Sequence, residues 1–247
     1  MDYISGEIFV IDKPLGWTSF DVVKRLRGAL TRLLGLKRFK VGHAGTLDPL
    51  ASGVLVICTG RATRQIESIQ AGRKVYEATV RLGESTPSYD LETEIDRTAP
   101  TAHITRELVE EVLSRFRGRI MQVPPVFSAV KVDGKRAYRY ARKGAEVELA
   151  AKPVEISSLE LLEYGLPDIR LRIECGKGTY IRSLARDLGE ALGTCAHLTS
   201  LRRLRVGSHD ISGALTPGEA VELIASSPVS FPEGYPVPPG FKGILEE

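Results

Sequence analysis

The segment Lys74–Gly83, KVYEATVRLG, alternates between two sets of side chains. One set, mainly apolar, is Tyr76, Ala78, Val80 and Leu82; the opposite set is Val75, Glu77, Thr79 and Arg81. A period of two residues predicts a β-strand with one buried face. The segment Ile169–Cys175, IRLRIEC, alternates in the same way. These two segments therefore predict a sheet that buries one face.

Other segments carry the signals of further strands and of helices. Gly6–Lys13 and Val54–Cys58 are rich in β-formers and predict strands. Thr18 and Asp21 form a capping-box pattern. The helix that follows is expected to bury Phe20, Val23, Leu26 and Leu30. Further helices are expected over 105–116 and 178–193, and after a second capping box at Thr216–Glu219. The irregular order predicts an α+β fold with a mixed, largely antiparallel central sheet and flanking helices.

Composition and charge restrict the class of protein. The chain has 247 residues, of which 43% are hydrophobic, as expected for a globular protein with a sizeable core. We expect one domain over residues 1–227, followed by a Pro- and Gly-rich tail over 228–247. The charge is uneven, because residues 113–152 carry a net +7 and residues 84–111 a net −6. This basic region fits a polyanionic partner, although solvated charged faces would give the same pattern.

The cysteines and the N-terminus give information about the compartment. Cys58, Cys175 and Cys195 lie far apart in the sequence, which favours reduced thiols over disulfides and gives no zinc-finger spacing. No stretch has the length and apolarity of a signal sequence or a membrane span. We therefore expect a cytoplasmic protein with no metal and no membrane partner.

One acidic residue stands alone in a basic region. Asp48, within GHAGTLDPLASGVL (Gly42–Leu55), is the only acid between Val22 and Ile66, a stretch with nine Lys or Arg residues. Its neighbours are small residues and turn formers, which suit a cleft for a flat ring and also an ordinary tight turn. Asp48 is therefore either a turn residue or a functional carboxylate.

Several segments, in order, resemble the TruB family of pseudouridine synthases. Gly42–Leu55 is similar to the catalytic motif of that family, and Lys13–Ser19 to its opening motif. Tyr76 with Arg81–Gly83 resembles its second motif. Later matches are Pro124–Lys131, Gly134–Tyr138 with Ala141–Arg142, Lys177–Arg182 and Leu201–Arg203. Together these motifs extend over residues 6 to 225, about nine-tenths of the chain, and their common order makes the resemblance specific.

The resemblance implies a function and a set of site residues. The family converts a uridine in RNA to pseudouridine, and its bacterial members act on uridine 55 in the T-loop of tRNA. By this resemblance Asp48 is the catalytic carboxylate, and Arg182 a cation that keeps it charged. The substrate-binding residues are expected to be His43, Tyr76, Tyr180, Arg182 and Leu201. Lys13, Lys131 and Arg136 are expected to support the site, the last two in a basic RNA-gripping insertion over about 120–152.

The reaction is an isomerisation, so we expect no cofactor, and we expect a monomer that needs no protein partner. Asp48 either attacks C1′ of the ribose, or assists a route through loss of the C2′ proton with Tyr76 as base. One alternative is an inactive RNA-binding or tRNA-folding protein on the same fold. Another is a glycosidic-bond hydrolase, although such enzymes normally use two carboxylates.

Two features depart from the pattern of the family. Thr93 stands where the family usually has a glycine, in a surface turn that we expect not to affect the carboxylate. Bacterial members usually end in a PUA-type RNA-binding domain, which the Pro-rich sequence of the tail does not resemble. We therefore expect the basic segments to supply the remaining tRNA contacts.

Overall fold

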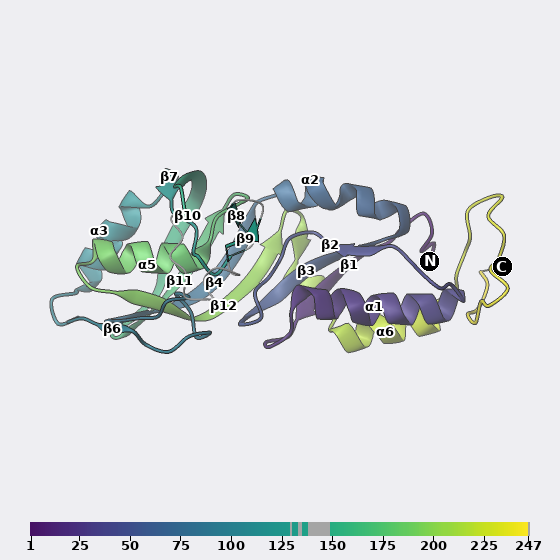
Figure 1. Ribbon diagram of the computed structural model, residues 1–247, viewed down its shortest axis with the longest axis horizontal. Helices are drawn as coiled ribbons and strands as arrows, with labels where there is room; N and C mark the ends of the chain where they lie inside the picture. Colours follow the sequence, from purple (N-terminus) through teal and green to yellow (C-terminus); the bar gives the residue numbers. More distant parts are fainter. Residues whose placement is uncertain (129, 133–134, 138–148, 247) are drawn as a thin grey trace. The chain divides into compact units, whose positions relative to one another are not determined.

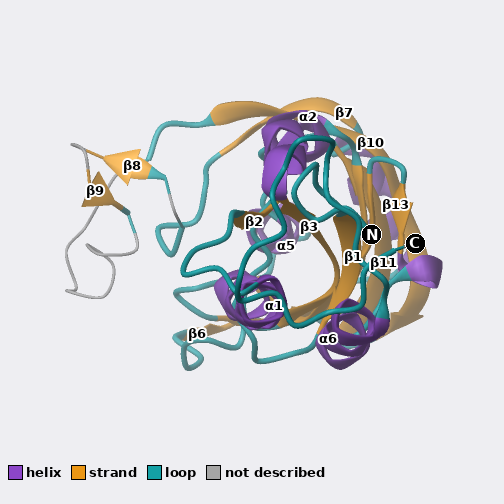
Figure 2. Cartoon of the chain, turned by 90° about the vertical axis from the view of Figure 1, so that its right-hand side faces the viewer, coloured by secondary structure: helices purple, strands orange, loops and turns teal. Residues whose placement is uncertain are grey.

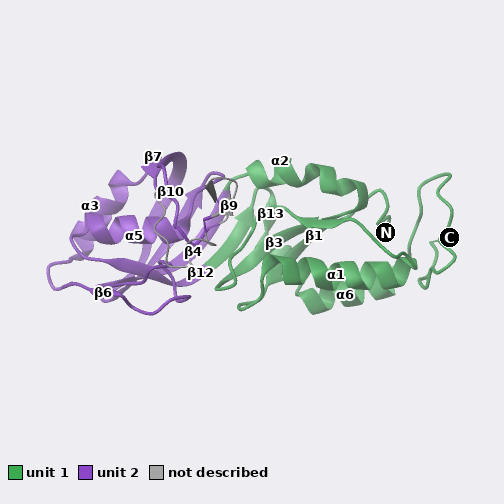
Figure 3. Ribbon diagram, in the orientation of Figure 1, with its two compact units in different colours: residues 1–73, 202–247 green, residues 74–201 purple. Residues whose placement is uncertain are grey.

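The computed structural model describes residues 1–128, 130–132, 135–137 and 149–246. It divides into two units, each with its own packing (Figure 3). Unit 1 combines Met1–Arg73 with Arg202–Glu247, and unit 2 is Lys74–Leu201. The strand β12, Ala196–Val206, crosses this division, so its first half belongs to unit 2 and its second half to unit 1.

The sheet of unit 1 is apolar on both faces. It contains β1 (Ile8–Lys13), β2 (Val41–His43) and β3 (Ala51–Thr59), and both β1 and β2 pair antiparallel with β3. The end of β12 belongs to the same sheet and pairs with β13 (His209–Asp210). Alternate residues point to opposite sides. Phe9, Ile11, Leu55 and Ile57 join a core with α1 (Ser19–Leu34) and α6 (Pro217–Ser226). Val54, Val56 and Cys58 face Ala62 of the 3-10 helix η1 (Gly60–Gln65), with Ile66 and Ile69 of α2 (Ile66–Ala71) packed against them.

The predicted first helix is confirmed, but one residue of its buried face is wrong. Thr18 and Asp21 form both hydrogen bonds of the capping box at the start of α1. Val23, Leu26 and Leu30 are buried, whereas Phe20 is 59% exposed. The buried stripe begins at Ser19 instead, which places Phe20 to one side of it. The Phe20 ring lies 5.9 Å from the guanidinium carbon of Arg27.

Unit 2 contains the two segments in which apolar residues alternate with others, Lys74–Gly83 and Ile169–Cys175. They form β4 (Lys74–Leu82) and β11 (Asp168–Cys175), which pair antiparallel, with Tyr76 opposite Ile173. Next in the sheet come β10 (Lys152–Gly165) and β7 (Gly118–Gln122), and the first half of β12 lies beside β4. Its described residues form the helices α3 (Arg106–Arg115) and α5 (Ile181–Ala191). Two small hairpins are β5 (Glu84–Ser85) with β6 (Arg97–Thr98), and β8 (Lys131–Val132) with β9 (Lys135–Arg136).

The C-terminal segment packs on unit 1 without a helix of its own. Val229 is 1% exposed, and Phe231 and Phe241 pack against the same core as α1 and α6. The Lys242 N–H donates to the Leu33 carbonyl at 2.8 Å, near the end of α1. The amino terminus of Met1 donates to the Pro228 carbonyl at 2.6 Å, so this segment also holds the start of the chain.

These elements confirm the predicted α+β class, with a mixed, largely antiparallel sheet and flanking helices (Figures 1 and 2). The predicted domain boundary after residue 227 stays a prediction, since the two units divide the chain elsewhere. Within the described ranges, no helix has the length and apolarity to cross a membrane.

Candidate active site

Asp48 lies in a loop of unit 1 between β2 and β3. The Asp48 carbonyl accepts a hydrogen bond from the Ala51 N–H at 3.0 Å, which closes a turn over Pro49. The side chain is half-buried. The backbone therefore forms the turn that the sequence allowed, and the carboxylate lies at the edge of that turn.

Arg203 clamps this loop from β12. Its side chain is buried, and its guanidinium donates to the carbonyls of Gly45 and Thr46 at 3.2 Å each and of Val54 at 2.7 Å. These carbonyls lie on both sides of Asp48, so one cation fixes both ends of the loop. Gly53 (φ 101°) allows this approach, since a Cβ there would lie 2.1 Å from the Arg203 carbonyl oxygen.

Ser19 holds the loop from the first residue of α1. Its hydroxyl accepts from the Leu47 N–H at 2.8 Å and donates to the Leu47 carbonyl at 3.0 Å. Both bonds are buried, and Leu47 is the residue before Asp48. The hydroxyl thus replaces water for both backbone groups of Leu47.

Lys13 is a buried cation that interacts with Asp48. It is fully buried, and its ammonium donates to the carbonyls of Pro14 at 3.0 Å and Trp17 at 2.6 Å. Burial lowers the pKa of Lys13 to about 8, the negative charge of Asp48 opposes that shift, and the positive charge of Arg203 adds to it. The attraction between Lys13 and Asp48 favours the charged form of the lysine.

His43 ends β2, beside the same loop. Burial and the charge of Arg203 lower its pKa, while the backbone of Gly45 partly offsets them. The Nδ1 atom of His43 is buried and makes no hydrogen bond of good geometry. The lowered pKa of His43 favours the neutral form of its ring.

The predicted base-binding residues belong to unit 2. Tyr76 is 8% exposed on β4, and Leu201 lies on the neighbouring strand β12. Tyr180 is the N-cap residue of α5, and its backbone N–H and carbonyl both bond to the Gln122 side chain, at 2.9 Å and 3.1 Å. The structure therefore fixes the backbone of Tyr180, whose side chain remains half-buried.

Arg182 is buried at the start of α5, among hydrogen-bond acceptors. It donates to the carbonyls of Ser88 at 3.2 Å and Phe127 at 3.0 Å, and its Nε lies 3.5 Å from a carboxylate oxygen of Asp90. Both side chains of this ion pair are nearly inaccessible to water. Sequence reasoning did not predict Asp90 as a partner of Arg182.

The loop that carries Ser88 and Asp90 also contains Thr93, which stands where the family usually has a glycine. The Thr93 hydroxyl accepts from the Ser88 N–H at 3.1 Å and lies 2.8 Å from the Ser88 hydroxyl. The Thr86 hydroxyl donates to the Asp90 carbonyl at 2.7 Å. Thr93 therefore braces the loop that presents Ser88 and Asp90 to Arg182.

The remaining predicted site residues, Lys131 and Arg136, lie in the predicted insertion. Lys131 and Arg136 lie in the hairpin β8–β9, where the structure places the backbone alone. Part of the predicted insertion (129, 133–134 and 138–148) lies outside the described residues, and with it Gly134, Tyr138, Ala141 and Arg142.

Comparison with known proteins decides the family. A sequence model described as "TruB family pseudouridylate synthase (N terminal domain)" matches residues 31–181, and one for the "tRNA pseudouridylate synthase B C-terminal domain" matches residues 182–222. The chain belongs to the TruB family. It is therefore a pseudouridine synthase, an isomerase.

Curated relatives of this TruB-family chain match over nearly their whole length. The tRNA pseudouridine synthase B of Parabacteroides distasonis is 57% identical over 233 residues, which is 94% of this chain and 99% of that protein. The protein of the same name from Phocaeicola vulgatus is 61% identical over 216 residues, 87% of this chain and 92% of that protein.

Solved structures share the fold of this TruB-family chain. In a Cbf5-Nop10-Gar1 complex, a chain with 30% identity aligns over 90% of this one with a TM-score of 0.67. In an archaeal box H/ACA sRNP Nop10-Cbf5 complex the identity is 28% and the TM-score 0.63. The alignments cover 55% and 54% of the solved chains, so this TruB-family chain spans about half of their length.

One residue that holds the Asp48 loop, Arg203 of β12, was missed by sequence reasoning, although its signal was present. Arg203 belongs to the matched Leu201–Arg203 motif, but only Leu201 was assigned a role. Arg203 lies between Arg202 and Leu204 in the sequence. Nothing in that local pattern indicates that its carbonyl acceptors lie about 150 residues earlier. Only the pairing of β12 within the sheet reveals that contact.

Proposed function

We propose that this enzyme converts uridine 55 in the T-loop of tRNA to pseudouridine, with Asp48 as the essential carboxylate. The names of the curated relatives support tRNA as the substrate. The single observation that carries the role of Asp48 is its loop. Buried donors from α1 and β12 fix the backbone on both sides of a half-buried carboxylate, and the buried cation Lys13 lies nearby.

The reaction needs a carboxylate but no outside reagent. The N1–C1′ bond of the uridine breaks, the base turns, and C5 joins C1′. N1 gains a proton and C5 loses one, so no electrons enter or leave. Asp48 either attacks C1′ to form a covalent intermediate or assists loss of the C2′ proton with Tyr76 as base. Both routes require the carboxylate in its charged form.

The uridine must leave its stack before this chemistry is possible. Extrusion of a base costs a few kcal/mol, whereas stacking on an aromatic ring returns about 1–3 kcal/mol. Tyr76 is the proposed stacking residue, while Tyr180, Leu201 and His43 complete the contacts to the nucleotide. Arg182 is proposed to help keep Asp48 ionised, and Lys131 and Arg136 to support RNA binding.

The role of Asp48 is tested by Asp48→Asn, which keeps the shape of the side chain and removes its charge. We expect pseudouridine formation in tRNA to fall by more than about a thousandfold, while tRNA affinity stays within about tenfold, because a carboxylate contributes little to binding an anion. Asp210→Asn makes the same chemical change at an exposed acid of unit 1 and serves as the control.

Mapping pseudouridine in the product tests the position, and an assay for free uracil tests the alternative reaction. A glycosidic-bond hydrolase would release uracil, whereas an isomerase keeps the base attached. Full activity of Asp48→Asn would remove Asp48 from the mechanism. Modification only at positions outside the T-loop would overturn the proposed substrate site, and tRNA binding by the wild type without product would favour an inactive binding protein.

A further inference from the structure

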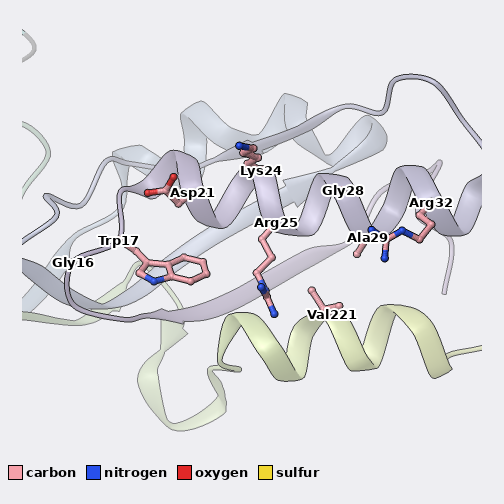
Figure 4. Close-up of a pocket in the computed structure, with 9 residues that line it drawn as sticks. All are labelled: Gly16, Trp17, Asp21, Lys24, Arg25, Gly28, Ala29, Arg32 and Val221. Atoms are coloured by element: carbon pink, nitrogen blue, oxygen red, sulfur yellow. The ribbon is translucent and has the colours of Figure 1, made fainter.

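An open groove runs along the outer side of α1 in unit 1. It has a volume of about 720 Å³ and lies between α1 and α6 (Figure 4). The side chain of Arg25 extends from α1 toward α6, and the Trp17 ring lies beside the start of α1. The lining residues are Gly16, Trp17, Asp21, Lys24, Arg25, Gly28, Ala29, Arg32 and Val221. Asp48 is not among them, so the groove is a feature separate from the reacting carboxylate.

The charge of the groove is positive. Lys24, Arg25 and Arg32 line it, and among the described residues none of the three forms an ion pair with a carboxylate. The one acid in the lining, Asp21, already accepts hydrogen bonds from the Thr18 N–H at 2.9 Å and the Thr18 hydroxyl at 2.6 Å. All three cations are exposed, and Arg25 extends toward α6 whereas Lys24 points away from it (Figure 4). Cations spread along one helix in this way fit a ligand that carries a series of negative charges.

Gly28 leaves the middle of the groove without a side chain. It lies in the interior of α1, where glycine costs about 0.5–1 kcal/mol relative to alanine. No packing contact requires it, since a Cβ built at Gly28 meets nothing within 4 Å. Ala29 and Val221 continue this lining of small side chains. A bulky chain can therefore approach the helix backbone closely between the cations.

The groove begins at the loop that carries Asp48. The Gly16 N–H donates to the Pro49 carbonyl at 2.8 Å, and the Lys13 ammonium donates to the Trp17 carbonyl at 2.6 Å. Gly16 and Trp17 line one end of the groove, and Pro49 is the residue after Asp48. A ligand that reaches Asp48 therefore has a direct continuation along α1.

We propose that this groove binds the sugar–phosphate backbone of the substrate tRNA as it leaves the reacting nucleotide. The proposal rests on the assignment of Asp48 as the reacting carboxylate. From Lys24 to Arg32 the helix rises about 12 Å at 1.5 Å per residue. The three cations are therefore spread along the groove and can contact more than one phosphate of an RNA strand. The Trp17 ring, at the end nearest Asp48, offers a surface on which a base can stack.

The charge of the groove is tested by the double variant Arg25→Gln/Arg32→Gln. We expect the Kd for full-length tRNA to rise at least about tenfold in low salt, and the slope of log K against log salt to fall by about two. The control, Arg106→Gln/Arg115→Gln, removes two exposed arginines from α3 and the same net charge. We expect its Kd and salt slope to match those of the wild type within about twofold.

The shape of the groove is tested separately by Gly28→Glu, with Gly28→Ala as its matched control. Both side chains enter open space and favour the helix, so both variants should be at least as stable as the wild type. Glutamate adds bulk and negative charge to the groove, whereas alanine adds neither charge nor length. We expect Gly28→Glu to raise KM at least about tenfold and to change kcat much less, and Gly28→Ala to bind tRNA normally.

Three outcomes would overturn the proposal. These are an unchanged Kd and salt slope for the arginine pair in the groove, equal losses for the groove and control pairs, and normal tRNA affinity of a folded Gly28→Glu protein. Normal tRNA affinity of Gly28→Glu would mean that any ligand of the groove is not RNA. All three readouts measure binding, so they are independent of whether Asp48→Asn abolishes product. Failure of this proposal is thereby distinguishable from failure of the proposed function.

Discussion

At the scale of single residues, the Asp48 loop depends on two buried cations with different roles. Arg203 donates to three backbone carbonyls, and a guanidinium stays charged when buried. Lys13 is a flexible ammonium whose pKa responds to burial and to the charges nearby. The arginine therefore acts as a structural clamp, and the lysine provides a charge whose presence depends on pH.

The lowered pKa of Lys13 predicts a pH dependence of stability. Between about 8, its value in the folded protein, and 10.5 the unfolded chain binds more protons at this lysine than the folded chain does. The free energy of unfolding contributed by Lys13 therefore rises with pH in that window, by up to about 1.4 kcal/mol per pH unit.

Denaturant unfolding of the wild type and of Lys13→Met at pH 7.5, about 9 and about 10 measures this effect. We expect the difference to move in favour of the wild type as the pH rises. Lys37→Met, at an exposed lysine of unit 1, controls for general alkaline effects. A difference that does not depend on pH would contradict the low pKa of Lys13.

At the scale of secondary-structure elements, α1 organises unit 1 from both of its ends. Its first residue, Ser19, holds Leu47 beside Asp48, and its C-cap residue, Gly35, contacts the C-terminal segment. Gly35 has a φ of 66°, and a Cβ there would lie 2.1 Å from the backbone of Gly240. Gly35 is therefore required both by the left-handed helix cap and by the close packing of two backbones.

Replacement of Gly35 separates these two requirements. We expect Gly35→Ala to lower the free energy of unfolding by about 2–4 kcal/mol, from the unfavourable φ and the forced shift of the segment. Gly234→Ala also has a positive φ, 74°, but meets nothing within 4 Å, so it should lose only about 1–2 kcal/mol. Equal losses in thermal or denaturant unfolding would show that the contact with Gly240 contributes nothing.

At the scale of the whole molecule, unit 1 is assembled from both ends of the chain. The segment 1–73 provides the Asp48 loop, and the segment from Arg202 onward returns with Arg203, α6 and the C-terminal segment. Phe231 and Phe241 pack edge to face, 5.4 Å apart, against the core of α1 and α6. The Pro- and Gly-rich segment is therefore part of this core.

A chain that stops after Ser227 tests this role. Burial of each large apolar side chain contributes about 1.5–3 kcal/mol, so loss of Val229, Phe231 and Phe241 should lower the free energy of unfolding by several kcal/mol. We expect the Tm to fall by about 10 °C or more. The point variant Phe241→Ala should show part of the same loss. An unchanged Tm after truncation would mean that the segment is a separate tail.

The sequence by itself determined several of the elements, the family and the candidate carboxylate. Alternation in β4 and β11, and capping boxes at Thr18 and Thr216, are local signals that side-chain direction and unsatisfied N–H groups impose on neighbouring residues. The ordered motifs located Asp48 because the function of the family, pseudouridine formation, requires particular residue types at particular places in the chain.

Only the tertiary structure decided which distant groups meet. The Arg203 contacts with Gly45 and Thr46, the pairing of Arg182 with Asp90, and the exposure of Phe20 depend on where strands and helices pack. The packing of the C-terminal segment and the groove along α1 depend on it too. A buried cation is stable only where acceptors converge on it, and such convergence arises from three-dimensional packing, which leaves no periodic trace in the sequence.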